Sequence, residues 1–120
     1  MSHNIKKEIC LIGAGDMAFE YSKVLDSLGI RYSVIGRGKK SAQFFENKTE
    51  HKVHLGGIDN IFNDKITDIP SKAIVAVGIR DLSEIAIKLM DYGVKNILLE
   101  KPGGVNLKEI HKVLRISKKH

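Results

Sequence analysis

The sequence has few residues of the types that cross-link, stiffen or fill the core of small proteins: one cysteine, two prolines and no tryptophan among 120 residues. The single cysteine, Cys10, excludes an internal disulfide and leaves too few thiols for a structural zinc site. No apolar run approaches the roughly 20 residues that a membrane-spanning helix needs. The polar start of the chain does not have the pattern of a secretory signal. We therefore expect a cytoplasmic protein without a membrane span or a metal site.

Positive charge is in excess, since 20 Lys and Arg against 14 Asp and Glu give a net charge of +6. The sequence has three Tyr and four Phe, too few for an aromatic platform that stacks single-stranded nucleic acid. It also lacks a zinc-finger, RNP-like or helix-turn-helix signature. Charged helix faces exposed to water account for the excess. Nucleic acid is therefore not an expected partner, and strongly salt-dependent retention on nucleic acid would reveal one.

Short apolar runs alternate with segments of helical periodicity along the whole chain. Strands are expected at 8–12, 32–35, 73–77 and 96–99, with a shorter one at Val53, and helical segments follow each of them. Such alternation predicts βαβ units, and hence a doubly wound parallel sheet of order 3-2-1-4-5 in a three-layer αβα, Rossmann-like fold. Ligands of such folds bind in the crevice between the first and fourth strands. The 120 residues are expected to form a single domain.

Several residues also mark helix ends. Gly29 is placed to end the first helix, and Ser41 is placed to cap a short second one. Asp81 and Glu84 have the spacing of a capping box.

The first strand runs directly into the string Gly13-Ala14-Gly15-Asp16-Met17-Ala18, a G-x-G-x-x-A pattern that opens a helix. In that context Gly13 makes the tight turn, Gly15 lets a pyrophosphate approach the backbone, and Ala18 allows close packing on the sheet. The backbone amides of Asp16 and Met17 then lie at the positive end of the helix, where an anion is held. The pattern predicts a dinucleotide site, the alternative being a tight turn without a ligand.

The end of the second strand bears on the choice of dinucleotide. A site specific for NAD places an acid there for the ribose 2′-hydroxyl, but this strand ends in Gly36 and Arg37. Arg37, helped by Lys39 or Lys40, can hold a 2′-phosphate that an acid would repel. The sequence thus favours NADP over NAD, unless Arg37 merely belongs to a solvated loop.

The fifth strand is followed by Glu100-Lys101-Pro102, and with this tripeptide the whole chain resembles a known domain. It is similar to the N-terminal NAD(P)-binding domain of the Gfo/Idh/MocA oxidoreductases, the glucose–fructose oxidoreductase and inositol dehydrogenase family. The resemblance implies that Lys101 lies near the nicotinamide, orients substrate and assists proton transfer. It implies that Glu100 contacts the nicotinamide or its ribose, and that Pro102 shapes the site.

Two departures from the family qualify this resemblance. After the fourth strand the family has a Thr-Pro-Asn-like stretch, whereas this sequence has Gly78-Ile79-Arg80, so Val77 and Gly78 are the expected contacts there. The family also has a C-terminal substrate domain that supplies a catalytic histidine, and we expect this domain to be absent from the chain.

The resemblance implies hydride transfer between a nicotinamide and a carbinol carbon of a sugar or polyol. Without a second domain the chain is expected to bind cofactor but to be incomplete for catalysis. We expect a homo-oligomer or a partner that supplies a substrate domain. The alternative is a non-catalytic module that senses nucleotide or binds protein.

Overall fold

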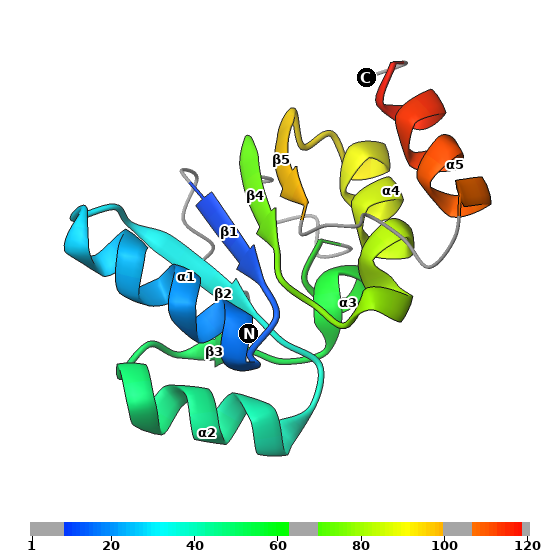
Figure 1. Ribbon diagram of the computed structural model, residues 1–120. Helices are drawn as coiled ribbons and strands as arrows, with labels where there is room; N and C mark the ends of the chain where they lie inside the picture. Colours follow the sequence, from blue (N-terminus) through cyan, green and yellow to red (C-terminus); the bar gives the residue numbers. More distant parts are fainter. Residues whose placement is uncertain (1–8, 63–69, 100–106, 119–120) are drawn as a thin grey trace.

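The structure is a computed structural model of residues 1–120, of which 9–62, 70–99 and 107–118 are described. Five strands form one parallel sheet in the order β3-β2-β1-β4-β5 (Figure 1). The strands are β1 (Ile9–Ile12), β2 (Tyr32–Ile35), β3 (Val53–His54), β4 (Lys72–Val75) and β5 (Asn96–Leu99). The predicted sheet order and doubly wound topology are confirmed.

The helices cover both faces of this sheet. They are α1 (Asp16–Ser27), α2 (Lys39–Thr49), α3 (Gly57–Phe62), the 3-10 turn η1 (Ile79–Asp81), α4 (Leu82–Tyr92) and α5 (Leu107–Ser117). Figure 1 shows α1 and α2 on one side of the strands and α3, α4 and α5 on the other. The predicted three-layer αβα arrangement is thus confirmed. None of the helices in the described ranges has the length and hydropathy of a membrane span.

The central strand β1 contributes to a hydrophobic core on each face, because alternate side chains of a strand point in opposite directions. Leu11 packs with Ala18 of α1 and Phe45 of α2. Cys10 and Ile12 belong instead to the core beneath α3 and α4. A continuous apolar run is the pattern expected of such a doubly covered strand. β1 and the turn that follows it are therefore fixed from both sides.

Of the three predicted helix ends, that at Gly29 is confirmed and that at Ser41 is wrong, whereas Asp81 does directly precede α4 but without the predicted cap hydrogen bond. Gly29 has φ +70° and its N–H donates to the Asp26 carbonyl at 3.1 Å, which closes α1 as expected. Ser41 lies inside α2, which begins at Lys39 behind Gly38, so it is not the cap. Asp81 makes no side-chain cap hydrogen bond, because it ends η1 with helical dihedral angles rather than the extended ones of a cap. The predicted capping box is absent for this reason.

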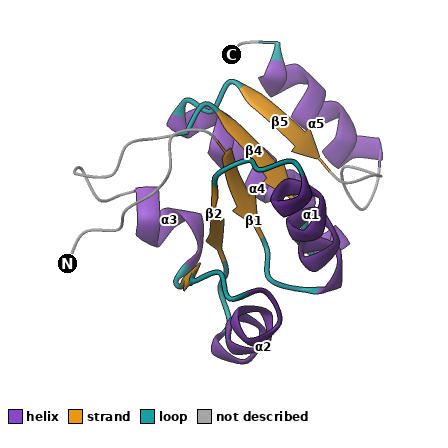
Figure 2. Cartoon of the chain, turned by 90° about the vertical axis from the view of Figure 1, so that its left-hand side faces the viewer, coloured by secondary structure: helices purple, strands orange, loops and turns teal. Residues whose placement is uncertain are grey.

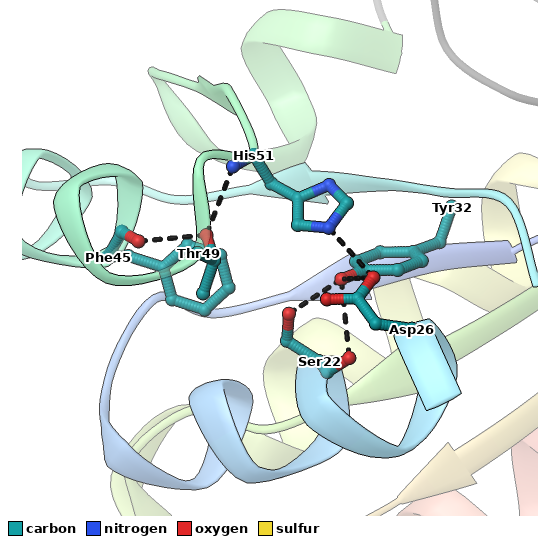
Figure 3. A network of polar contacts seen from close by, with 6 residues as sticks. All are labelled: Ser22, Asp26, Tyr32, Phe45, Thr49 and His51. Carbon is teal, nitrogen blue, oxygen red and sulfur yellow. Dashed lines mark hydrogen bonds and ion pairs between the residues drawn. The ribbon is translucent and has the colours of Figure 1, made fainter. Parts of the chain in front are cut away.

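A polar network ties α1 to β2 and to the chain before β3, at the amino end of the sheet (Figure 3). The Tyr32 hydroxyl donates to Asp26 Oδ1 at 2.9 Å and lies 2.6 Å from Ser22 Oγ, which is fully buried. His51 Nε2 lies 2.8 Å from the same Asp26 Oδ1, and its ring packs against that of Tyr32. Burial raises the pKa of Tyr32 to about 12. The network therefore fixes the carboxyl-terminal half of α1.

Candidate functional site

The turn between β1 and α1 requires a glycine at its first position. Gly13 has φ +122°, a conformation that residues with a side chain rarely adopt. A Cβ on Gly13 would also overlap with the carbonyl oxygen of Ala76, just beyond β4. The Gly13 N–H donates to the Ile35 carbonyl at 2.8 Å, so the turn is bound to the end of β2 as well. Gly13 thus joins the carboxyl ends of three strands.

The start of α1 leaves its first backbone amides available. Gly15 is the N-cap residue, and no described side chain accepts a hydrogen bond from the first turn. A Cβ built on Gly15 would meet no other described protein atom within 4 Å. The side chains of Asp16 and Met17 are exposed. A helix start with open amides and an unobstructed backbone is suited to hold an anion.

A cleft of about 110 Å³ lies at the carboxyl ends of β1 and β2, beside the segment that follows β4. It is lined by Ile12, Gly13, Ile35, Gly36, Arg37, Gly57, Ile58, Val77, Asp81 and Ile85. The strand order reverses between β1 and β4, where ligands of doubly wound folds bind. Apolar side chains form most of the cleft, and Arg37 and Asp81 are its charged residues. An apolar lining with a few polar groups is typical of sites that bind small molecules.

Gly36 and its neighbours hold the backbone of Arg37 at the rim of this cleft. The Gly36 N–H donates to the His54 carbonyl at 3.0 Å, and the Gly36 carbonyl accepts from Gly57 N–H at 3.1 Å. A Cβ on Gly36 would lie 2.9 Å from Val53 Cγ1, so the close packing here requires a glycine. The Arg37 side chain is exposed and passes over Gly57, with its Nε 3.8 Å from where a Gly57 Cβ would lie.

Asp59 on α3 is a second charged group near Arg37, but α4 already holds it. Its carboxylate accepts from Lys88 Nζ at 2.6 Å and from the Tyr92 hydroxyl at 3.0 Å. The hydrogen bond from Lys88, then that from Tyr92, holds the pKa of the Asp59 carboxyl below its usual range, and the charge of Arg37 adds a smaller contribution. Asp59 does not line the cleft. Its negative charge is directed at Lys88 rather than into the cleft.

A second hollow, of about 150 Å³, lies on the other side of the glycine turn, between α1 and α2. Gly15, Asp16 and Ser41 line it together with three phenylalanines and Lys48. The Lys48 Nζ lies 4.6 Å from the ring centroid of Phe19 and 4.7 Å from that of Phe44. Cation–π contacts of this kind hold an ammonium group in place. A fixed positive charge therefore stands beside the start of α1.

Most of the predicted site residues come together in the structure, and some lie elsewhere. Gly13, Gly36, Arg37 and Val77 line the cleft, and Gly15 and Asp16 line the adjoining hollow. Met17 follows them on α1 and is 46% exposed, whereas Gly78 precedes η1 and lines neither space. Glu100, Lys101 and Pro102 lie outside the described residues. The described residue that precedes them, Leu99, is in register with Val75 at the carboxyl edge of the sheet.

Sequence reasoning did not assign Gly57, Ile58, Asp81, Ile85 or Lys48 to the site. Asp81 is predicted to cap a helix, and Ile58 and Ile85 are apolar helix residues that no motif sets apart. Lys48 carries a weak signal, since Ser41, Phe44, Phe45 and Lys48 share one face of α2 at helical spacing. Nothing in the spacing of the other four indicates that they meet, because they come from two separate segments, one after β3 and the other after β4.

Scans of the sequence against protein-family models and against functionally described proteins find no match. The fold, however, matches solved dehydrogenases. The WlbA dehydrogenase from Bordetella pertussis, solved with NADH and UDP-GlcNAcA, has a TM-score of 0.75 at 13% identity and covers 98% of this chain and 35% of its own. The myo-inositol 2-dehydrogenase from Lactobacillus plantarum has a TM-score of 0.75 at 16% identity, and the match covers 98% of this chain and 34% of the dehydrogenase. The 3-ketoreductase KijD10 from Actinomadura kijaniata, solved with TDP-benzene and NADP, has a TM-score of 0.73 at 15% identity. The match covers 98% of this chain and 36% of KijD10.

At these identities the likeness establishes the shared fold. The chain spans about a third of the length of each of these neighbours.

Proposed function

We propose that this chain, whose structural neighbours are dehydrogenases of the Gfo/Idh/MocA type, is the nicotinamide-dinucleotide-binding domain of an oxidoreductase that acts on sugars or polyols. In this proposal the chain binds NADP in preference to NAD at the carboxyl edge of its sheet. When bound, the nicotinamide supplies hydride chemistry at a carbinol carbon of the substrate. The residues of this chain bind and orient the coenzyme.

The start of α1 is the observation that carries the proposal. Gly13 is required by the protein itself, since a side chain there would overlap with Ala76. Gly15 is not, because the described protein leaves the space above it open. A ligand that closely approaches this backbone explains why a glycine stands there. The uncapped first turn and the nearby Lys48 favour a negatively charged ligand, as the diphosphate of a dinucleotide is.

Arg37 supports the preference for NADP. It stands at the rim of the cleft on a backbone that Gly36 fixes, and its guanidinium is exposed. The nearby acid Asp59 is bound to Lys88 and Tyr92 of α4 and does not line the cleft. A planar guanidinium suits a phosphate group, and Lys39 and Lys40 add positive charge in the first turn of α2.

The resemblance to the family supplies the catalytic part of the proposal. Lys101 would lie beside the nicotinamide, where an ammonium group can hydrogen-bond a sugar hydroxyl and assist proton transfer. Glu100 and Pro102 would contact and shape the same region. β5 ends at Leu99, level with the end of β4, which is compatible with this placement.

The chain by itself is proposed to bind coenzyme with little or no turnover. It matches only about a third of each neighbour, and proximity between coenzyme and substrate supplies much of the power of such enzymes. We propose that it works in the cytoplasm and that self-association or a partner completes its pocket.

Fluorescence titration of the purified chain with NADPH and NADH tests the proposal. We expect saturable binding of both, tighter for NADPH. Gly15→Val should weaken both by about tenfold or more, because the branched side chain blocks the approach of the diphosphate. The control Gly38→Val changes another N-cap glycine with open space around it, at α2. Folded protein that binds neither coenzyme, or that binds them equally well with Gly15→Val, would contradict the proposal.

A non-catalytic module that senses nucleotide is the second candidate. The replacement of the family's Thr-Pro-Asn-like stretch by Gly78-Ile79-Arg80 favours it. It predicts the same coenzyme affinity, but no turnover of polyols when a substrate domain of the neighbouring type is added. Hydride transfer in that mixture, lost with Lys101→Ala, would support the enzyme instead.

A further inference from the structure

Asp81 is the acidic residue in the lining of the cleft at the carboxyl ends of β1 and β2, and the proposed function gives it no role. The residue is half-buried. Its side chain forms no hydrogen bond or ion pair within the described part of the chain, and it does not cap α4. A carboxylate can only accept hydrogen bonds. An unpartnered one that is partly withdrawn from water therefore favours a ligand that carries N–H or O–H donors.

Asp81 and Arg37 reach this cleft from two different segments. β1 lies between β2 and β4 in the sheet (Figure 2), Arg37 follows β2, and Asp81 ends η1 behind β4. The two residues line the same cleft, but no ion pair joins them. A ligand in the cleft can therefore meet a cation from the β2 side and a hydrogen-bond acceptor from the β4 side.

The size of the cleft limits what part of a coenzyme it can take. Its volume of about 110 Å³ is well below the roughly 300–1,000 Å³ of sites that enclose an entire small molecule. Ile35, Ile58 and Ile85 are buried apolar residues of its lining. Such a space can bury one ring system of a larger ligand, whose remaining groups lie outside.

The position of Arg37 indicates which ring system this is, and here the inference rests on the proposed function. In NADP the 2′-phosphate and the adenine are attached to adjacent carbons of one ribose. An arginine that holds the phosphate therefore has the adenine within one sugar ring of it. Of the two hollows beside the glycine turn, Arg37 lines only the cleft that also contains Asp81. Adenine carries one exocyclic amino group, which supplies N–H donors to a carboxylate.

We propose that the Asp81 carboxylate accepts a hydrogen bond from the exocyclic amino group of the coenzyme's adenine. Asp81 thereby selects adenine coenzymes over those whose base has a carbonyl at that position. A carbonyl oxygen there would face the carboxylate as acceptor against acceptor, so that neither group would have a partner. This assignment goes beyond the proposed function, in which no residue recognises the base.

Fluorescence titration of the purified chain with NADPH and with its deamino analogue, whose base is hypoxanthine, tests this. We expect NADPH to bind at least about tenfold more tightly, because a site that hydrogen-bonds an N–H group rejects an analogue that lacks it. Asp81→Asn should reduce the preference to within about twofold, because an amide can turn its oxygen toward an amine or its N–H toward a carbonyl. The matched control is Glu84→Gln, which removes the same charge from the first turn of α4 outside the cleft and should keep the preference.

Equal affinity of the wild type for the two coenzymes would overturn the role of Asp81 and leave the coenzyme site standing, and this comparison needs no variant. A preference that persists in Asp81→Asn, or that Glu84→Gln also abolishes, would overturn it too. Another residue or the net charge would then be responsible. Binding of neither coenzyme would contradict the proposed function and this inference together. Unchanged circular dichroism is expected for Asp81→Asn, since the carboxylate contacts no described polar group.

Discussion

Gly13 and Ala76 approach so closely that the hydrogen of Gly13 is the only substituent that fits beside the Ala76 carbonyl oxygen. This contact joins the turn after β1 to the segment after β4, the two places between which the strand order reverses. The requirement is purely steric and belongs to the protein without a ligand. It separates the structural glycine of the turn from Gly15, which has open space above it.

Gly13→Ala should therefore destabilise the fold by about 2–4 kcal/mol, from the left-handed backbone and the overlap together. Gly15→Ala should change the free energy of unfolding by less than about 1 kcal/mol, because Gly15 has an extended backbone that alanine adopts. Urea unfolding of both variants measures the difference. Equal losses would contradict the distinction between the two glycines.

Arg37→Ala should weaken NADPH binding by about ten- to a hundredfold and leave NADH binding within about twofold. A charge-assisted hydrogen bond contributes about 1.5–3 kcal/mol, and only NADPH carries the 2′-phosphate. Arg31→Ala, a change of an exposed arginine at the opposite end of β2, is the control. Parallel fluorescence titrations measure both affinities, and an equal loss for the two coenzymes would remove the phosphate-binding role.

Tyr32→Phe should cost about 1–3 kcal/mol of stability, since it leaves the fully buried Ser22 hydroxyl without its partner. Tyr92→Phe removes a hydroxyl whose partner Asp59 is half exposed, and should cost less. Urea unfolding near neutral pH compares the two variants. A cost for Tyr92→Phe as large as that for Tyr32→Phe would contradict the role of burial.

Tyr32 also makes stability depend on alkaline pH. Its pKa in the folded chain is about 12, raised from an ordinary value of 10. The folded state therefore holds the proton more tightly, so the contribution is full below pH 10 and is lost as pH rises toward 12. We expect the wild type to lose more stability over this range than Tyr32→Phe does. Urea unfolding between pH 10 and 12 measures this for both proteins. An equal loss in the free energy of unfolding for the two would refute it.

The Asp59 carboxyl should make a pH-dependent contribution at the acid end. Its pKa is lowered by the hydrogen bonds from Lys88 and Tyr92, so this contribution is full above the ordinary value of 3.8 and is lost as pH falls through the folded value. Lys88→Met keeps most of the side chain but removes the ammonium group, and should raise the pKa of Asp59. Carboxyl NMR titration measures the shift. The stability effect should be small, because Asp59 is half exposed and solvent screens the pair.

The fold could be predicted from the sequence because the apolar runs and the glycine positions indicate the same strands and helices. The apolar runs at 32–35 and 96–99 are strands with the predicted bounds, and Gly29 ends α1 as expected. The errors lie at helix starts: Ser41 is inside α2, and Asp81 precedes α4 as predicted but, as the last residue of a 3-10 turn, makes no cap hydrogen bond. A cap depends on one residue's dihedral angles, which neighbours along the chain do not determine.

The site was less predictable than the fold. The glycine turn and Arg37 carry local patterns, so sequence reasoning found them. Ile58 and Ile85 resemble any other apolar helix residue, and only the packing of α3 against α4 places them in one cleft. Gly57 belongs to the site only because the Arg37 side chain lies over it, and this contact has no signal in the sequence.

The polar network around Tyr32 has a further consequence for the opposite end of α1. Ser22 and Asp26 immobilise the later turns of the helix, while Gly13 immobilises the chain that leads into it. The amide groups of the first turn are therefore held in position without a ligand. Little conformational entropy is then lost when a ligand binds to them. Loss of the Tyr32 contacts should therefore make the entropy of coenzyme binding less favourable, although Tyr32 lies at the opposite end of α1 from the proposed site.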